Sequence, residues 1–207
     1  MPSRFPAPGG RLWTVIFIAV NVLLVAMAVV LGLSDDDVRA SCAEAAAAGG
    51  VVEAVNFNDP KQTVIAGTKA AVEKACEVLK AAGAKRALPL SVSAPFHSSL
   101  MKPAAERLRE KLAATAFAAP QIAVVNNIDV AVVSEADAIR DALYRQAFGP
   151  VRWVETIQAL KARGHSHIIE CGPGKVLSGM VKRIDAELVS ATVFDPVSLA
   201  EAKALLV

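Results

Sequence analysis

One histidine of the chain, His97, lies in a setting that suits a general base. It belongs to the stretch SVSAPFHSSLMKP (91–103), between a proline-phenylalanine turn and the start of a helical segment. The ordinary pKa of an imidazole is near neutral, so a histidine held at a strand-to-helix turn can accept a proton and return it later. Such a base needs a partner hydroxyl or thiol elsewhere in the fold.

A second candidate for chemistry is the glycine-containing stretch GPGKVLSGMVKR (172–183). A glycine-rich turn before a helix can bind phosphate, but this stretch lacks the G-x-x-x-x-G-K-[ST] spacing of a nucleotide loop. We interpret Gly172 and Gly174 as a tight strand-to-helix turn. The cationic side chains that we then expect to face solvent are those of Lys175, Lys182 and Arg183.

The elements before His97 predict a small sheet with two helices. Apolar or alternating runs predict strands at 27–33, 51–58, 63–68 and 84–92. The turn DPKQ joins the second and third strands as a hairpin. An alanine-rich helix follows the cap SDDD, and a second helix spans 69–83 and stops at its terminal glycine. The order β-α-β-β-α-β predicts a ferredoxin-like unit.

After His97 the pattern changes to strands that alternate with helices, which predicts a parallel α/β layer. The expected helices span 101–116, 135–147, 151–163 and 175–184, and the expected strands span 121–129, 167–174 and 188–194. Three strands are few for a sheet with both faces to cover. The fold class is therefore α/β, with a layer that needs further strands.

Composition excludes several classes of function. The net charge is +2, with 20% charged residues. No basic stripe is interleaved with aromatic residues, so the sequence does not indicate a nucleic-acid-binding surface. The three cysteines are far apart and match no metal spacing. We interpret Cys42, Cys76 and Cys171 as buried thiols of a reducing compartment, and we expect no metal and no cofactor.

An uncharged apolar run of 22 residues, LWTVIFIAVNVLLVAMAVVLGL (12–33), allows two interpretations. As one helix it would be about 33 Å long, enough for a hydrocarbon core of roughly 30 Å. The alternative is that residues 27–33 form the first strand of the small sheet. That assignment leaves only about 15 apolar residues, which is short for a membrane span.

Several segments together resemble one enzyme family, the malonyl-CoA:acyl-carrier-protein transacylases. The resemblance covers about residues 26–207, in order and without large gaps, whereas residues 1–25 have no counterpart in the family. It rests on the segments AVNFNDPKQTVIAG, SAPFHSSLMKPAAERL, VVNNIDV, RQAFGPVRW and IIECGPGKVLSGMVKRI. The fold that it implies is a ferredoxin-like small domain at 26–92 and the C-terminal part of an α/β-hydrolase-like acyltransferase domain at 93–207.

The resemblance implies acyl transfer by a serine-histidine pair. His97 matches the family's general base, and Gln146 of YRQAFGP matches the glutamine whose backbone carbonyl orients that histidine. Such a bond determines which ring nitrogen accepts the proton. Asn58 and Asn127 match the family's cleft and are candidate substrate-binding residues, as is Asn56. The implied partners are malonyl-CoA and an acyl carrier protein, which could meet the basic face around Lys182.

The family's nucleophilic serine, in a G-H-S-L-G elbow, has no equivalent string in these 207 residues. The nearest imitation is GHSHI (164–168), but an elbow needs a strand before the serine and small residues around it. Here the order is helix, Gly164-His165-Ser166, then strand. We therefore expect Gly164 to end a helix and Ser166 to lie in a loop, and we expect Ser98 and Ser99 to be turn and helix-cap residues.

Two hypotheses follow for the whole chain. The first is a cytoplasmic member of the transacylase family that lacks the nucleophile elbow, with residues 1–25 arising from a truncated or frame-shifted gene start. The second is a non-catalytic, membrane-tethered module that binds a carrier protein, with membrane contact through residues 12–26. The two hypotheses differ in whether residues 27–33 form a strand or the end of a membrane helix.

Overall fold

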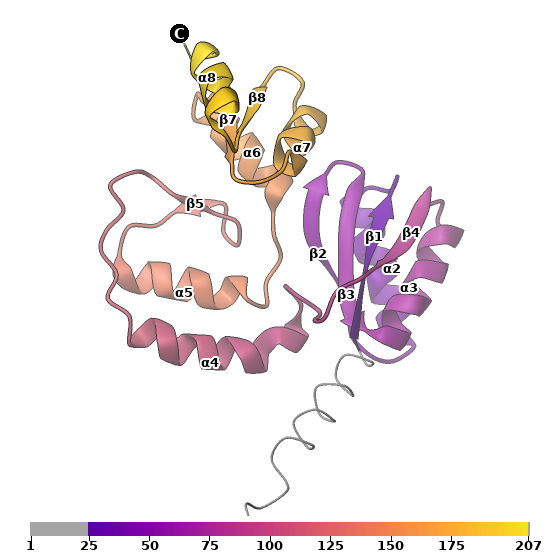
Figure 1. Cartoon of the computed structure of the whole chain (residues 1–207). Helices are drawn as coiled ribbons and strands as arrows, with labels where there is room; N and C mark the ends of the chain where they lie inside the picture. The colour runs from indigo at the N-terminus through magenta and orange to yellow at the C-terminus, as the bar shows by residue number, and fades with distance from the viewer. Residues whose placement is uncertain (1–24, 207) are drawn as a thin grey trace, which may run out of the picture.

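The computed structural model describes residues 25–206 (Figure 1). Its first region is a four-stranded antiparallel sheet with the strand order β2-β3-β1-β4. Figure 1 shows both helices of this region on one face of the sheet. The elements are β1 (Val25–Leu31), α2 (Asp35–Ala47), β2 (Val52–Asp59), β3 (Gln62–Thr68), α3 (Lys69–Ala81) and β4 (Arg86–Leu90). The sequence predicted this order of elements.

Strand β1 lies inside the sheet and pairs on both sides. Val29 is opposite Val64 of β3 and opposite Leu88 of β4. The interpretation of this segment as a strand is therefore confirmed for residues 27–31, whereas Gly32 and Leu33 follow the end of the strand. Among residues 25–206, no helix is both long enough and apolar enough to cross a membrane. The membrane contact predicted for residues 12–26 lies mostly outside the described residues.

The core of the first region lies between the sheet and its two helices. Alternate strand residues point into it, and α2 and α3 contribute their small and apolar faces. Ser34 caps α2 because its hydroxyl accepts a hydrogen bond from the Asp37 amide at 3.2 Å. The fully buried side chains include Val30, Val38, Ile65 and Leu79. This region therefore has a continuous apolar core of its own.

The second region begins with η1 (Ser99–Met101), which leads into α4 (Lys102–Ala113). Helix α5 (Ala136–Gln146) packs beside α4 (Figure 1). The strand expected at 121–129 is wrong in extent, because only β5 (Val125–Asn126) forms and it pairs with β6 (Ala131–Val132). The remaining residues of that stretch form a loop with an exposed Ile122 and Val124.

The chain continues through α6 (Trp153–Ala162), β7 (His167–Cys171), α7 (Val176–Ile184), β8 (Val189–Val193) and α8 (Pro196–Ala204). Strands β7 and β8 pair in parallel, but β5 does not join them. The expected three-stranded parallel layer is therefore wrong for the described residues, which have two. Helix α8 was not predicted from the sequence, although a capping box between Asp195 and Ser198 marks its start.

The three cysteines are free thiols, but they do not share one environment. Cys42 and Cys76 are buried in the first region, whereas Cys171 is exposed at the end of β7. The prediction that all three are buried is thus wrong for Cys171. Burial raises the pKa of Cys42 to about 12, so this thiol is an inert core group.

Candidate active site

His97 lies at the junction between the two regions, just after β4. Its backbone has a φ of +64°, in the left-handed region that side-chain-bearing residues seldom adopt. Its Nδ1 atom lies 3.0 Å from the backbone oxygen of Gln146. A carbonyl oxygen can only accept, so this bond requires the proton on Nδ1 and leaves Nε2 as a proton acceptor.

The turn that presents His97 is fixed by two bonds to its neighbours. The Ser98 hydroxyl is fully buried and donates to the Pro95 carbonyl at 2.6 Å. The Ser99 amide donates to the Glu53 carboxylate of β2 at 2.7 Å. Ser98 therefore serves the turn and is not available to His97, and Ser99 starts the helical turn η1, as the sequence analysis expected.

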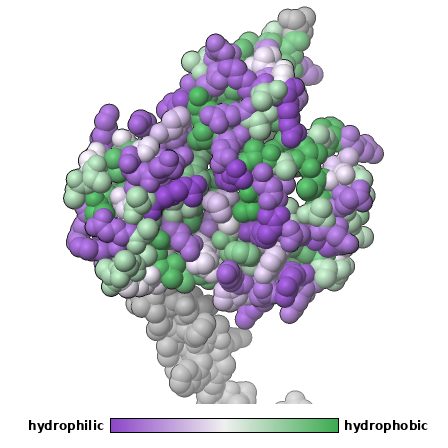
Figure 2. All heavy atoms as spheres, turned by 180° about the vertical axis from the view of Figure 1, so that it is seen from behind, coloured by the Kyte–Doolittle hydropathy of each residue, from purple (hydrophilic) through white to green (hydrophobic). Residues whose placement is uncertain are grey.

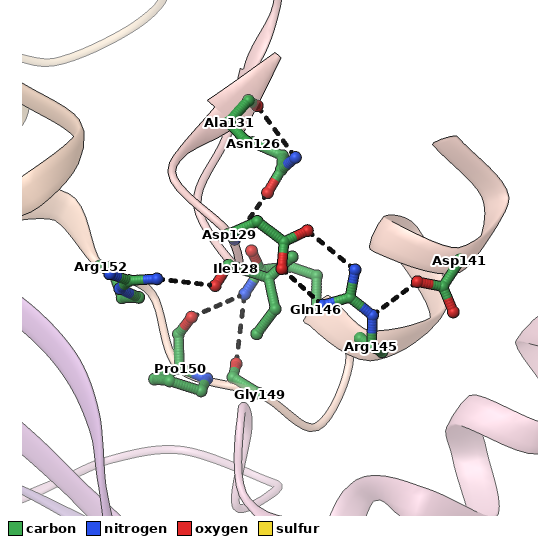
Figure 3. Close-up of polar contacts among 10 residues, drawn as sticks. All are labelled: Asn126, Ile128, Asp129, Ala131, Asp141, Arg145, Gln146, Gly149, Pro150 and Arg152. Carbon is green, nitrogen blue, oxygen red and sulfur yellow. Dashed lines mark hydrogen bonds and ion pairs between the residues drawn. The ribbon is translucent and has the colours of Figure 1, made fainter. Parts of the chain in front are cut away.

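Gln146 is the last residue of α5, where helix carbonyls lack a partner within the helix. Its own carbonyl is free to accept from His97, while its side-chain amide donates to the carbonyls of Gly149 and Pro150, each at 3.2 Å (Figure 3). The side chain thus closes the turn that follows the helix. The backbone carbonyl of Gln146 is thereby held within hydrogen-bond distance of the His97 imidazole.

Asn127 lies near Gln146, and both line a cavity of about 380 Å³ whose other walls are mainly apolar. The side-chain oxygen of Asn127 accepts from the Thr156 hydroxyl at 3.2 Å, and its carbonyl accepts from the Arg152 amide at 3.3 Å. Seen from behind, the molecule shows apolar surface over the lobe that carries β5 (Figure 2). A mostly apolar cavity with three amide side chains, those of Asn126, Asn127 and Gln146, suits an organic ligand.

The structure brings together three of the four predicted site residues. His97 contacts the Gln146 carbonyl, and Gln146 shares a cavity with Asn127, although His97 is not among the residues that line that cavity. Asn58 lies at a bulge of β2, and no hydrogen bond among the described residues connects its side chain to the other three. Asn56 comes closer to the site, because it forms a parallel bridge to Val151, five residues after Gln146.

The segment GHSHI (164–168), which is similar in sequence to a nucleophile elbow, has the structure that we expected. Gly164 follows α6 with a φ of +89° and ends the helix. Ser166 lies in the loop before β7, and its hydroxyl is 2.9 Å from Nδ1 of its neighbour His167. Among residues 25–206, no serine hydroxyl forms a hydrogen bond with His97.

The start of α7, where a phosphate could bind, is already bonded to a carboxylate of the same chain. Glu170 of β7 accepts bonds from the amide and the hydroxyl of Ser178, at 2.8 and 2.6 Å. These bonds and the first amides of α7 lower the pKa of Glu170, so a carboxylate already fills the place of an anion. Lys175 and Lys182 are exposed as expected. Arg183 is exposed but also pairs with the buried Asp59 at 2.7 Å, which the sequence analysis missed.

Ion pairs that were not predicted from the sequence lie next to Gln146. Arg145 bonds Asp129 with two nitrogens and Asp141 with a third (Figure 3). The pKa of Asp129 is lowered, chiefly by its hydrogen bond from Arg145. The spacing of Asp141 and Arg145 on one helix could have indicated their pair. The link to Asp129 spans two elements, and nothing local in the sequence predicts it.

Known families and proteins resemble this chain over most of its length. Residues 25–194 match the family model described as "Acyl transferase domain". The chain therefore belongs to the acyltransferase domain family, and it is similar to the malonyl CoA-acyl carrier protein transacylases within that family.

Two curated transacylases illustrate the similarity. The Escherichia coli (strain K12) protein is 51% identical over 177 residues, which cover 86% of this chain and 57% of the relative. The Bacillus subtilis (strain 168) protein is 44% identical over 171 residues, which cover 83% of this chain and 54% of the relative. The chain thus spans little more than half the length of these relatives.

Two solved structures extend the likeness to the fold. An acyl-carrier-protein S-malonyltransferase from Burkholderia pseudomallei is 63% identical with a TM-score of 0.85, covering 92% of this chain and 64% of that one. A malonyl-transacylase in complex with its type II polyketide synthase acyl-carrier protein is 48% identical with a TM-score of 0.86, covering 91% and 61%.

Proposed function

We propose that this chain supplies the general base of a malonyl-transfer reaction, with His97 as the catalytic residue and Gln146 as the residue that orients it. The observation that carries this proposal is the 3.0 Å contact between His97 Nδ1 and the Gln146 carbonyl. It leaves Nε2 as the acceptor that a serine-histidine reaction requires. The similarity to malonyl transacylases supports the same roles.

In the proposed reaction, His97 Nε2 takes the proton of a serine hydroxyl while the oxygen attacks the malonyl thioester carbon. The C–S bond breaks, and the imidazolium returns the proton to the departing CoA thiolate. In the second half, His97 takes the proton of the carrier-protein thiol, whose sulfur attacks the acyl-serine ester. The ester C–O bond breaks, and the serine oxygen recovers the proton. The exposed Lys175 and Lys182 would attract an acidic carrier protein.

The nucleophile does not come from the described residues in this proposal. Ser98 is buried and bonded to Pro95, and Ser166 lies in a loop beside His167. We therefore propose that the 207-residue chain alone does not form an acyl-enzyme. The sheet order β2-β3-β1-β4 supports a ferredoxin-like small domain at 26–92, followed by part of an acyltransferase domain at 93–207.

In the first experiment, the purified chain is incubated with labelled malonyl-CoA. The Escherichia coli transacylase, treated in the same way in a separate sample, is the positive control. We expect the control to become labelled on a serine and this chain to remain unlabelled. A labelled serine in this chain, located by digestion and mass spectrometry, would contradict the proposed absence of the nucleophile.

The second experiment tests His97 in a chimera that joins the unmatched part of the Escherichia coli transacylase to residues 25–206 of this chain. We expect the chimera to transfer malonyl groups and H97A to lower kcat by about 10²- to 10⁴-fold. H165A, which removes an exposed histidine, is the matched control and should leave kcat unchanged. An H97A chimera that keeps the kcat of the unsubstituted chimera would refute the proposed role.

A further inference from the structure

The turn after α5 contains an ion-pair network that reaches the orienting residue Gln146. We propose that Arg145 and Asp129 form a positioning pair that holds the Gln146 carbonyl toward His97 and thereby fixes the tautomer of the imidazole. This inference rests on the proposed function of His97. It assigns a positioning role to two residues whose pairing no sequence pattern indicated.

Each of the three guanidinium nitrogens of Arg145 donates one hydrogen bond in this network (Figure 3). Its two terminal nitrogens donate to the two oxygens of Asp129 at 2.7 and 2.8 Å. Its Nε atom donates to Asp141 at 2.7 Å, one turn earlier on α5. A planar guanidinium held in this way by two carboxylates has a defined direction as well as a defined position. The last turn of α5 is therefore anchored in orientation.

Asp129, the anchor, is itself held by the β5–β6 hairpin. Its amide donates to the Asn126 side-chain oxygen at 2.8 Å, and the Asn126 side-chain amide donates to the Ala131 carbonyl at 3.0 Å (Figure 3). One side chain thus closes the hairpin turn from both ends. A carboxylate on such a turn is a fixed reference point for Arg145.

The other side of the same loop is held by Arg152. Its amide donates to the Asn127 carbonyl and its guanidinium to the Ile128 carbonyl, both at 3.3 Å. Between the two arginines, Gly149 packs so closely that an added Cβ would lie 2.8 Å from the Arg145 carbonyl oxygen. The segment from Arg145 to Arg152 is therefore bonded to the loop that follows β5 at both of its ends, through Arg145 and through Arg152.

The pair is better suited to positioning than to stabilising the fold. The Arg145 and Asp129 side chains are 36% and 34% exposed, and ion pairs at that exposure contribute little to the free energy of unfolding. Their geometric effect is larger, because Arg145 precedes Gln146 directly. Loss of the pair frees the helix end to fray, and the Gln146 carbonyl then leaves the Nδ1–H group of His97.

The test measures the His97 tautomer in the full chain by long-range ¹H–¹⁵N correlation NMR at about pH 9, above the ordinary imidazole pKa of about 6.5. H97Q assigns the His97 signals among the three histidines of the chain. We expect the wild-type ring to carry its proton on Nδ1. We expect R145M and D129N to raise the fraction of the Nε2–H form about threefold or more, the size expected from losing one hydrogen bond.

The matched control is R140M, on the same helix. Arg140 also makes three bonds, to the carbonyls of Leu112 and Thr115 and to Asp137, but on the side toward α4. R140M should lower the thermal midpoint without changing the His97 nitrogen shifts. Wild-type shifts in R145M and D129N, or an equal change in R140M, would overturn the positioning role.

A wild-type ring in the Nε2–H form would overturn the proposed role of Gln146 and this inference with it. Wild-type shifts in the two variants alone overturn the inference and leave the proposed function intact. Far-UV circular dichroism checks that each variant folds. If R145M does not fold, D129N decides, since it keeps the bond between Arg145 and Asp141.

Discussion

The two regions of the molecule are built in different ways. In residues 25–90 every strand belongs to one four-stranded sheet, and two helices cover a continuous apolar core. In residues 99–206 the strands form two separate pairs, and the buried apolar cluster is small, with Ile157, Val181 and Leu188 at its centre. Many large apolar side chains of this second region, such as Ile122 and Val197, are exposed.

This difference shows what holds the candidate site. His97 follows the first region, and its partner Gln146 belongs to the second. The second region has little core near Gln146, so polar bonds from Arg145, Arg152 and the Gln146 side chain itself determine the position of that residue. Hydrophobic packing supplies the frame of the site, and directional hydrogen bonds supply its geometry.

The largest expected effect is a loss in the free energy of unfolding that differs between the cores of the two regions. Ile65 of β3 and Ile157 of α6 are both fully buried. We expect I65A to lower the free energy of unfolding by about 3–5 kcal/mol, since the close-packed sheet cannot collapse onto the cavity. I157A should cost less, about 2 kcal/mol, because the second region has freedom to relax. Urea denaturation measures both values, and an equal or larger effect of I157A would contradict the comparison.

An intermediate effect concerns the ion pair that connects the two regions. Arg183 of α7 bonds Asp59 of β2 at 2.7 Å, and the Asp59 side chain is only 6% exposed. We expect R183M to destabilise the chain by about 1–3 kcal/mol, because it leaves a buried carboxylate without its cation. A double-mutant cycle with D59N should give a coupling energy of about 1 kcal/mol. K182M, on the neighbouring exposed residue, is the control, and additive effects would show that the pair is not coupled.

The smallest expected effect is a difference in the titration of two aspartates. Burial raises the pKa of Asp35 above 3.8, whereas the hydrogen bond from Arg145 lowers the pKa of Asp129 below 3.8. The Asp35 contribution to stability is therefore lost as the pH rises through its folded pKa. The Asp129 contribution is lost as the pH falls through its own. Carboxyl ¹³C NMR titrations should give midpoints on opposite sides of 3.8, and R145M should raise only that of Asp129.

Local patterns in the sequence predicted the first region more closely than the second. Strands 51–58 and 63–68 and helix 69–83 agree with β2, β3 and α3 within two residues, because a half-buried strand and an amphipathic helix have clear periods. The strand expected at 121–129 failed because its apolar residues find no neighbouring strand in the described structure and remain exposed in a loop. An apolar run specifies a strand only where a partner pairs with it.

The sequence by itself determined which residues could do chemistry here, because residue types and short spacings identify a proton acceptor such as His97 and its family context. The family resemblance already implied that the Gln146 carbonyl orients His97, and the tertiary structure gives that contact across a separation of 49 residues along the chain. Only the tertiary structure paired Arg145 with Asp129 and Arg183 with Asp59. Side-chain periods are local properties of the backbone, whereas hydrogen bonds between distant elements depend on how those elements pack.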